Sequence, residues 1–434
     1  MLETGSATVK AGYAGEDTPK AYFNTATGYL PLSSEGSSFL GASNSSADAS
    51  DSVFYRPTNK STHTKQYFPG NEAGVFRDNQ EILAPVQHGL IMDFDAVEHI
   101  WDYALKNRLY ADPYDHPILM AEPVYNTKGR RERTAQIMFE RFNVPSLYLA
   151  KEPVLAAFSQ GKPNALIVDI GAGKTTVVPV HDGYVLHQPT QMTKVAGDSL
   201  DAHTYRTILQ PKGVTDIPCT YEYTKSMSPD GLLAVRPSPL AGTASGSYRA
   251  YMQQQVIRDL KESLCVINEL PIDESLYQRI SKKPFTLPDG NTIDVGLERV
   301  LLGESIFNPN LGLGSEVTQD LHPTRTFCGL QRMVCNTVDA CDVDIRRDMY
   351  SNIILSGGGS LTSGLPARLQ AEVTSLIPHG IKCRVNVPTT SAESLFATWV
   401  GGSVLSSLGT FHQMWVSRTE YEEFGTGILL RKCP

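Results

Sequence analysis

The chain has 434 residues, of which 41% are hydrophobic and 19% are charged. This composition is that of an ordinary globular protein, and the length suits two domains or one bilobal body. The net charge of −8 gives no electrostatic reason to expect direct binding to DNA or to an anionic membrane. No apolar run approaches membrane-spanning length, and the first residues do not resemble a signal peptide. The seven cysteines have no CxxC spacing, which favours a reducing compartment and argues against a zinc site.

The predicted elements alternate between helices and strands along the chain. Two stretches have the composition of loops, and they are 33–52 and 211–247. Apolar residues at helical spacing predict helices over 93–105, 153–161, 256–264 and 365–376, and the basic run 128–133 predicts the start of a solvated helix. Short apolar runs predict buried strands at 165–168, 177–178 and 353–355. This alternation indicates α/β layers.

Three turns combine glycines with hydroxyl side chains at points where an apolar strand ends. They cover 5–10, 168–176 and 356–364. Glycine lets backbone N–H groups approach a phosphate closely, and a following helix adds the positive end of its dipole. The second turn is not a P-loop, because that motif needs glycine where Val168 stands. Turns so far apart in the chain suggest two half-domains that hold one nucleotide between them.

Five separated motifs occur in an order that resembles actin. They are Val9-Lys-Ala-Gly-Tyr-Ala-Gly-Glu-Asp17, Gln136-Ile-Met-Phe-Glu140 with Phe142-Asn-Val-Pro145, Ser356-Gly-Gly358, Trp399-Val-Gly-Gly-Ser403 and Phe411-His-Gln-Met-Trp415. The resemblance covers nearly the whole chain. It implies an α/β, bilobal, actin-like fold, a duplicated ribonuclease H-like fold with a central nucleotide cleft, which Hsp70 chaperones and sugar kinases share. The first half would comprise 1–160 with 396–434, its smaller subdomain being 25–77, and the second half 161–395, its smaller subdomain being about 206–330.

Within the family, four segments are more similar to the nuclear actin-related proteins of class four than to filament actin. They are His181-Asp-Gly-Tyr-Val-Leu186, Ala196-Gly-Asp198, Tyr251-Met252 before Val256-Ile257, and Arg431-Lys-Cys-Pro434. Such proteins are held, together with actin, on a long helix of a remodeller's ATPase subunit. The resemblance therefore implies a structural subunit of nuclear chromatin-remodelling or histone acetyltransferase complexes. Its partners would be that helix and actin or other actin-related proteins, with histones as a further candidate partner and the cytoplasm as a second candidate compartment.

The resemblance also implies which residues would bind ATP. The first loop contributes Ser6, Ala7, Thr8 and Lys10, and the second contributes Gly171, Gly173, Lys174 and Thr175. Gly197 would lie at the ribose, the adenosine would be contacted by Arg258, Lys261 and Glu262, and the base and ribose would pack against Gly358, Gly359, Leu361 and Thr362. Asp169, with Glu3 acting through water, would hold Mg²⁺ or Ca²⁺. Without the resemblance, the charged set on one helix face would be better explained as a solvated stripe.

Several positions depart from the actin pattern. The first-loop aspartate of actin is Glu3 here, the second-loop aspartate is Ala172, and the glutamine that orients the attacking water is Glu152. The remaining replacements, of a histidine, a lysine and an aromatic residue, are Thr176, Leu395 and Thr362. Phosphoryl transfer depends on a positioned water and on charge stabilisation by a metal ion, so these changes predict at most a slow ATPase.

Glu152 is the one candidate for a catalytic group. A glutamate at this position could act as general base for a water molecule. An ion pair with Lys151 or Lys174 is the simpler explanation of the same carboxylate.

The strand before the first loop is expected to be weak. Only Met1 and Leu2 precede Glu3, whereas actin has an apolar strand there, central in its first sheet. Its absence would leave neighbouring strands unpaired. Either the true start lies upstream or this half is weakened.

A partner surface is expected between the C-terminal segment and the first half. In the actin fold this groove receives amphipathic helices of binding proteins. The matching apolar residues are Tyr148, Leu149, Phe411, Met414 and Trp415. Packing in the core is the alternative for these side chains.

Two rival functions remain open on the sequence. The first is a cytoskeletal actin-like protein that forms filaments and turns over ATP. The second is a sugar kinase or chaperone-type ATPase of the same fold. The actin-type motifs at 399–402 and 411–415 argue against the kinase, and the serine-rich stretch and the altered nucleotide-binding residues argue against the filament.

The serine-rich stretch generates a prediction about assembly. Residues 33–52 contain nine serines and few apolar anchors, so docking them into a neighbouring subunit would cost conformational entropy with little apolar burial in return. We expect the protein to stay in the supernatant when it is sedimented in salt that polymerises actin. Helical filaments in the pellet, seen by negative stain, would favour the cytoskeletal alternative.

Overall fold

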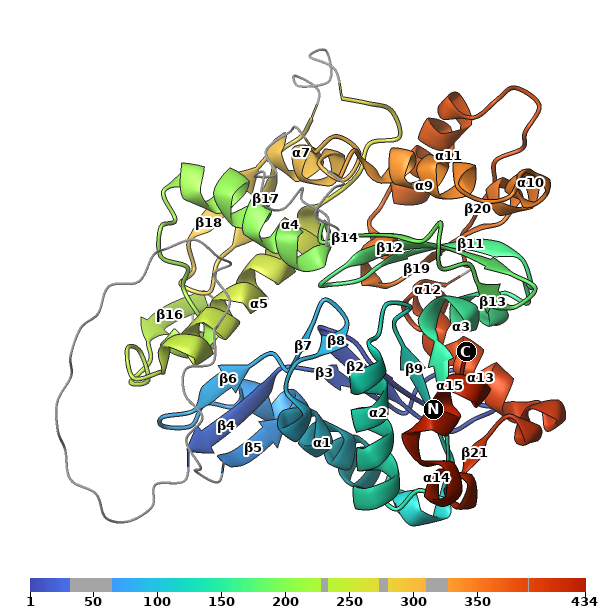
Figure 1. The fold of residues 1–434 in the computed structure, drawn as a ribbon. Helices are drawn as coiled ribbons and strands as arrows, with labels where there is room; N and C mark the ends of the chain where they lie inside the picture. Colours follow the sequence, from blue (N-terminus) through green and yellow to red (C-terminus); the bar gives the residue numbers. More distant parts are fainter. Residues whose placement is uncertain (32–64, 228–232, 273–279, 310–326, 389) are drawn as a thin grey trace, which may run out of the picture.

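The computed structural model describes the chain except residues 32–64, 228–232, 273–279, 310–326 and 389. Two bodies, each built on a central β-sheet, lie one above the other in Figure 1. We call the body that contains β1 the first half and the body that contains β11 the second half. The serine-rich stretch predicted at 33–52 lies outside the described residues.

The first half is built on a sheet with strand order β21-β10-β9-β1-β2-β3. Its strands are β1 (Leu2–Thr4), β2 (Thr8–Ala11), β3 (Ala21–Asn24), β9 (Ile118–Glu122), β10 (Ser146–Lys151) and β21 (Val416–Ser417). The helices around this sheet are α1 (Phe94–Asp102), α2 (Lys128–Gln136), α3 (Glu152–Ser159), α13 (Ala397–Ser407), α14 (Arg418–Phe424) and α15 (Ile428–Lys432). α3 and α13 pack together so closely that a Cβ at Gly401 would overlap the Leu155 carbonyl.

The second half is built on a sheet with strand order β13-β12-β11-β19-β20, and β14 pairs with β12. Its strands are β11 (Ala165–Ile170), β12 (Thr175–His181), β13 (Tyr184–Val185), β14 (Gln191–Thr193), β19 (Ile353–Ser356) and β20 (Val385–Asn386). Its helices include α9 (Leu330–Asp339), α10 (Val343–Ser351), α11 (Leu365–Leu376) and α12 (Ser391–Leu395). β11 is antiparallel to β12 and parallel to β19, so the turns after β11 and β19 lie at the same edge of the sheet.

Smaller elements extend each half on the same side of the molecule (Figure 1). In the first half they are β4 (Thr27–Pro31), β5 (Lys65–Pro69), β6 (Glu81–Leu83) and the hairpin of β7 (Val86–Gln87) and β8 (Leu90–Ile91). In the second half they are α4 (Gly197–Thr204), α5 (Gly246–Leu264), α7 (Glu298–Glu304) and the hairpins of β15 (Tyr223–Met227) with β16 (Leu233–Pro237) and β17 (Lys283–Thr286) with β18 (Thr292–Val295).

Most predicted elements are confirmed, and their local signals explain why. The Asp93 side chain accepts a hydrogen bond from the Ala96 amide and so caps α1. The predicted strands 165–168 and 353–355 are buried parts of β11 and β19. The loop prediction over 211–247 is wrong in part, because this stretch contains the hairpin of β15 and β16 and the start of α5.

The short first strand is present and paired. β1 pairs antiparallel with β2 over its full length, and Leu2 lies opposite Met120 of the parallel strand β9. Leu2 is fully buried, with 1% of its surface exposed. The expectation that the neighbouring strands would lack a partner is therefore wrong, because three residues suffice to bridge β2 and β9.

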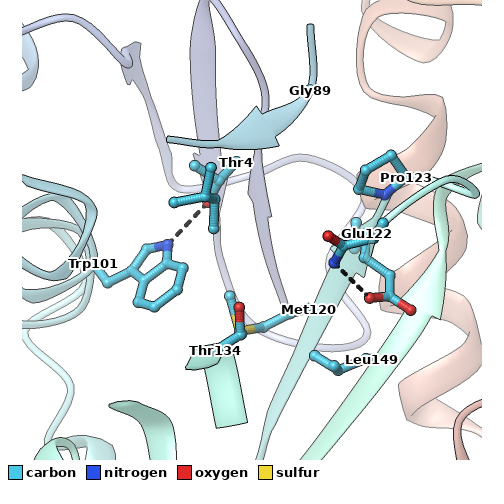
Figure 2. A pocket seen from close by; sticks show the side chains of 11 residues that line it. Thr4, Gly89, Trp101, Met120, Glu122, Pro123, Thr134 and Leu149 are labelled. Carbon is cyan, nitrogen blue, oxygen red and sulfur yellow. Dashed lines mark hydrogen bonds between the residues drawn. The ribbon is translucent and has the colours of Figure 1, made fainter. Parts of the chain in front are cut away.

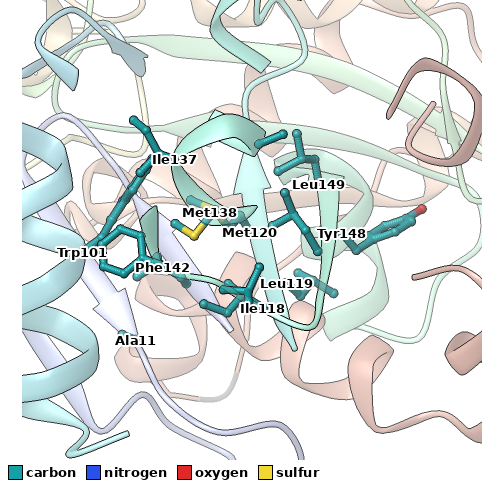
Figure 3. Packing of buried hydrophobic residues seen from close by; sticks show 14 of the residues in the cluster. Ala11, Trp101, Ile118, Leu119, Met120, Ile137, Met138, Phe142, Tyr148 and Leu149 are labelled. Atoms are coloured by element: carbon teal, nitrogen blue, oxygen red, sulfur yellow. The ribbon is translucent and has the colours of Figure 1, made fainter. Parts of the chain in front are cut away.

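Three of the residues predicted to line the groove, Tyr148, Leu149 and Phe411, lie in the core of the first half instead. Figure 3 shows Leu149 and Tyr148 pointing to opposite faces of β10. Leu149 packs with Met120 in the core, and Tyr148 is closed off by an edge-to-face contact with buried Phe411, with ring centroids 4.9 Å apart. These side chains belong to the core because helices cover both faces of the sheet.

A buried ionic network joins the C-terminal segment to this sheet. Glu122 at the end of β9 is 2.7 Å from the Lys151 ammonium and 3.0 Å from the Arg131 guanidinium. The same guanidinium donates to the Cys433 carbonyl, and the Asn126 amide donates to Glu122 (Figure 2). Arg131 is 7% exposed, so the helix that begins at the basic run is not solvated on all sides as its composition predicted.

We predict that Arg131→Met lowers the free energy of unfolding by about 3 kcal/mol, because it removes one partner of a buried ionic network. Arg141→Met is the control, since Arg141 also pairs with a glutamate but its side chain is 69% exposed. That change should cost less than about 0.5 kcal/mol. Urea unfolding of both variants measures the difference, and equal losses would mean that the buried network adds nothing.

Candidate nucleotide site

The three predicted turns lie at the strand ends that face the junction of the two halves. The first turn is closed by a hydrogen bond from the Gly5 amide to the Thr8 carbonyl, at 3.0 Å. The second is closed from the Gly171 amide to the Lys174 carbonyl, at 2.9 Å. The third follows β19, where the Ser356 hydroxyl donates to the Asp169 carboxylate at 2.8 Å. The parallel register of β11 and β19 thus joins the second and third turns.

The first and second turns also meet, through the turn between β7 and β8. The Gly89 amide donates to the Ser6 hydroxyl at 2.8 Å, and His88 Nδ1 lies 2.6 Å from the Gly173 carbonyl oxygen. A Cβ at Gly173 would lie 2.8 Å from Ser6 Oγ and 3.0 Å from the His88 nitrogen. Glycine at 173 is therefore required by the close approach of two backbones.

Lys174 forms a buried ion pair across this junction. Its ammonium lies 2.7 Å from Glu152 at the start of α3 and 4.8 Å from the centre of the Tyr125 ring. Burial disfavours the charged ammonium, but Glu152, Tyr125 and Asp169 together outweigh this and raise the pKa of Lys174. For the Tyr125 hydroxyl, burial acts in the opposite direction and raises the pKa to about 12. The pairing of Glu152 with Lys174 that the sequence suggested is confirmed, and no ion pair between Glu152 and Lys151 occurs, since Lys151 binds Glu122.

Two buried carboxylates lie near this pair. Glu3 binds the Lys10 ammonium at 2.6 Å through one oxygen, and its other oxygen is buried without a hydrogen-bond partner. Burial raises the pKa of Glu3 and of Asp169 above their ordinary values, despite the nearby lysines. Strongly perturbed carboxylates are more common at functional sites than in structural positions.

The start of α4 packs directly on the second turn. The Gly197 amide donates to the Gly171 carbonyl at 3.1 Å, and the Asp198 amide donates to the Ala172 carbonyl at 2.8 Å. A Cβ at Gly197 would lie 3.1 Å from Ala172 Cα, so a side chain at 197 would require the second turn to shift by a few tenths of an ångström.

Two basic side chains of α5 contact the start of α4. The Lys261 ammonium donates to the Gly197 carbonyl at 2.9 Å and lies 2.5 Å from Asp201, while Arg258 lies 3.3 Å from Asp198. The structure thus brings Gly197, Arg258 and Lys261 together, as the sequence predicted. Glu262, the third predicted member of this face, is exposed.

The third turn is packed against the end of β11. A Cβ at Gly357, whose φ is +82°, would lie 2.5 Å from the Ile170 carbonyl, and one at Gly359 would overlap the Ile170 side chain. Leu361 is 42% exposed, and the Thr362 hydroxyl donates to the Gly359 carbonyl at 2.9 Å. The predicted residues 358–362 therefore present backbone and one apolar side chain at the edge of the junction.

His88, Gly89 and Tyr125 were missed by the sequence analysis. His88 and Gly89 have positive φ values of 50° and 77°, and Gln87 pairs with Leu90, so they form a tight hairpin turn. A His-Gly pair between short apolar runs is a weak turn signal. The Tyr125 hydroxyl donates to the His88 carbonyl at 2.7 Å, a contact that only the fold brings about.

A small cavity and the arrangement of possible metal ligands limit which ligands fit near this site. Figure 2 shows a cavity beside the first turn, lined by Thr4, Trp101 and Glu122, whose volume of about 30 Å³ suits a water molecule rather than a nucleotide. Among the described residues, no group of three or more His, Cys, Asp or Glu side chains could hold a metal ion directly. None of the helices that the structure describes has the length and apolar character of a membrane span.

We predict that Lys174→Met lowers the free energy of unfolding by about 3 kcal/mol, because it removes the cation from the Glu152 carboxylate, whose side chain is only 18% exposed. The double variant Lys174→Met, Glu152→Gln should recover most of this loss, since both charges are then gone. Lys106→Met, which breaks an exposed pair with Asp102, is the control and should cost less than about 0.5 kcal/mol. Urea unfolding measures all three, and a double variant no more stable than Lys174→Met would contradict the pairing.

Comparisons with known proteins agree with this arrangement. The model of the actin family matches residues 1–434. The chain is 37% identical over 436 residues to a protein named Actin-related protein 4 from Oryza sativa subsp. indica, covering 100% of this chain and 98% of the relative. Proteins of the same name from Arabidopsis thaliana and Yarrowia lipolytica are 36% and 33% identical, covering 100% of this chain and 98% and 95% of the relatives. Together with the bilobal α/β fold, these matches establish that the chain belongs to the actin family, as an actin-related protein.

Proposed function

We propose that the chain binds ATP between its two halves and acts as a structural subunit of nuclear chromatin-remodelling or histone acetyltransferase complexes. Hydrolysis of the bound ATP is slow or absent. The observation that carries the nucleotide part is the meeting of three glycine turns from two sheets, at 5–8, 171–174 and 357–361. The assembly part rests on the resemblance to class-four nuclear actin-related proteins, and the relatives' shared name supports it.

The charges near the turns suit the phosphates of a nucleoside triphosphate. Lys10 and Lys174 are buried ammonium groups on the first and second turns. Each is held in place by a carboxylate, Glu3 or Glu152, so the positive charge is positioned before a ligand arrives. Fixed cations beside exposed backbone amides are the usual means of binding phosphate.

The residues present also fit a divalent cation held through water. The unpaired oxygen of Glu3 and the Asp169 carboxylate are the hard oxygen donors that Mg²⁺ and Ca²⁺ prefer. Both carboxylates carry raised pKa values because of burial, and a cation nearby would favour their charged forms. The bound cation would neutralise phosphate charge. Glu3 and Asp169 would orient its water ligands.

Slow hydrolysis is supported by three side chains. Ala172 offers no carboxylate on the second turn, and Thr176 is buried within β12. The Glu152 carboxylate is held by the Lys174 ammonium at 2.7 Å, so it is engaged in an ion pair instead of contacting a water molecule. A general base that is already neutralised by an ion pair contributes little to water activation.

We predict that the purified protein retains ATP through gel filtration and hydrolyses it at a rate far below that of filament actin. Reversed-phase chromatography of the released nucleotide identifies the ligand, and phosphate release under multiple turnover measures the rate. The control variant Gly173→Ala should lose the nucleotide, because its Cβ would meet Ser6 and His88. Turnover comparable to actin, or a wild-type protein without nucleotide in saturating Mg-ATP, would contradict the proposal.

The partner surface that fits a helix is smaller than the sequence suggested. Of the predicted lining, Met414 is 41% exposed and Trp415 is partly buried, packed edge to face on Phe411 at 5.1 Å. Val404 on α13 and Leu408, the residue that follows this helix, are 41% and 42% exposed. An apolar helix of a remodeller's ATPase subunit would dock on this reduced surface.

We predict that Met414→Glu releases a co-expressed remodeller ATPase-subunit helix, because burying the new charge against that helix is unfavourable. Bound nucleotide and melting temperature should stay nearly unchanged, since Met414 is outside the core. Met92→Glu is the matched control, because Met92 is 56% exposed on a different segment. Retention of the helix by Met414→Glu, or its equal loss from Met92→Glu, would show that the surface is wrongly assigned. Pull-down with mass spectrometry measures both.

A further inference from the structure

The start of α4 places a carboxylate directly beside the second turn. The Asp198 amide donates to the Ala172 carbonyl at 2.8 Å, and Ala172 is the position at which the turn offers no carboxylate of its own. The Gly197 amide donates to the Gly171 carbonyl, so two consecutive hydrogen bonds fix α4 on the turn. A different element of the chain thus brings a carboxylate next to the position where the turn lacks one.

Arg258 of α5 orients the Asp198 side chain. One guanidinium nitrogen donates to Asp198 Oδ1 at 3.3 Å, and the same guanidinium lies 3.6 Å from Asp201, one turn further along α4. The Asp201 side chain is 1% exposed and also lies 2.5 Å from the Lys261 ammonium, so its charge is matched inside the protein. The Asp198 side chain, by contrast, is 40% exposed.

The Asp198 carboxylate lies near the junction of the two halves. Burial raises its pKa, and Arg258 and His88 of the first half are among the groups that oppose this rise. His88 itself contacts the Gly173 carbonyl of the second turn. Within the described residues, Arg258 is the only hydrogen-bond donor to this carboxylate, and it uses Oδ1. Oδ2 can therefore accept a hydrogen bond from a ligand beside the turn.

The phosphates and the sugar of a nucleotide need different side chains. Lys10 and Lys174 are the buried ammonium groups of the first and second turns, and phosphates would bind beside them. A carboxylate repels phosphate but accepts hydrogen bonds from ribose hydroxyls, and dinucleotide-binding folds use an aspartate or glutamate in this way. A methylene group joins the ribose of a nucleoside triphosphate to its α-phosphate. A carboxylate at the edge of a phosphate-binding turn therefore suits the sugar.

We propose that Asp198 accepts hydrogen bonds from the ribose hydroxyls of the bound nucleotide and makes the site selective for ribose. This inference rests on the proposed function, because it names the residue that recognises the sugar at the same site. Arg258 is a positioning residue, since it holds one carboxylate oxygen and leaves the other to the ligand. A site that hydrogen-bonds a hydroxyl group binds an analogue without that group more weakly, because the acceptor then lacks its partner.

The test compares two nucleotides that differ only in the sugar. The full chain is loaded with etheno-ATP in saturating Mg²⁺, and either ATP or 2′,3′-dideoxy-ATP displaces it. We expect the wild type to need about tenfold more dideoxy-ATP than ATP for half-displacement, as for a hydrogen bond to a charged acceptor. In Asp198→Ala the two nucleotides should differ by less than about twofold, because neither then meets the acceptor.

Asp216→Ala is the matched control. Asp216 also pairs with an arginine of α5, accepting two hydrogen bonds from Arg249 at 2.9 Å near the start of the helix. This variant should keep the wild-type preference for ATP.

Asp198→Asn is a second variant, which keeps the shape of the side chain and removes its charge. It should show a preference between those of the wild type and Asp198→Ala. The backbone amide of Asp198 makes the bond to Ala172, so neither change removes the contact that fixes α4 on the turn. Thermal melting followed by circular dichroism checks that each variant is folded.

The outcomes separate this inference from the proposed function. Equal displacement by the two nucleotides in the wild type, or the same loss of affinity for both in Asp198→Ala, overturns the role at the ribose and leaves nucleotide binding in place. A loss for both nucleotides that depends on Mg²⁺ concentration also overturns it and assigns the carboxylate to the cation. A wild type that binds no etheno-ATP in saturating Mg²⁺ refutes the proposed function, and the inference with it.

Discussion

The close approach of the second glycine turn to the first half is the constraint on which the rest of this structure depends. Gly173 lies against Ser6 and His88 with little room for a side chain, so the second turn approaches the first half closely. Once that approach is made, Lys174 can reach Glu152, and α4 can close over the turn from the other side. An added methyl group at this one position would push apart the elements that form the candidate site.

Buried charges serve two different purposes in this chain. Arg368 on α11 is only 2% exposed, yet its guanidinium binds both oxygens of Glu304 at 2.6 and 2.7 Å and also binds Glu372. Its charge is matched within the protein, as expected for a structural role. Glu3 and Asp169 differ, because one oxygen of Glu3 has no partner and burial raises the pKa of both carboxylates. A cation bound beside these two carboxylates would supply the positive charge that favours their ionised forms.

Contacts between the halves are polar near the candidate site, whereas elsewhere an apolar cluster packs α3 against β11 and β12. The two main cores lie on separate sheets, and the residues that bridge them near the candidate site are an ion pair, a histidine and a serine. Interfaces of this kind permit relative motion of two bodies more readily than a continuous hydrophobic core does. A bilobal protein that must admit and retain a ligand between its halves benefits from such an interface.

Local features of the chain were predictable from its sequence because they depend on neighbouring residues. The apolar run 165–168 becomes buried strand β11, and Asp93 caps α1, since strand burial and helix capping are read from a few adjacent side chains. The glycine turns were also foreseen, because the actin-like motifs indicate which turns face each other. Lys174 was one of the two lysines considered as partners of Glu152. The order of these motifs alone indicated the family.

What the tertiary structure decided depends on contacts between segments far apart in the chain. Arg131 lies in a basic run that composition assigns to solvent, but the C-terminal carbonyl of Cys433 and the end of β9 bury it. Leu149 points into the core because α1 and α2 cover that face of β10, which periodicity within a strand cannot show. Tyr125 and His88 join the candidate site only because their separate loops are folded against the second turn. Sequence patterns report local backbone preference and one apolar face, whereas long-range pairing determines which distant segment covers it.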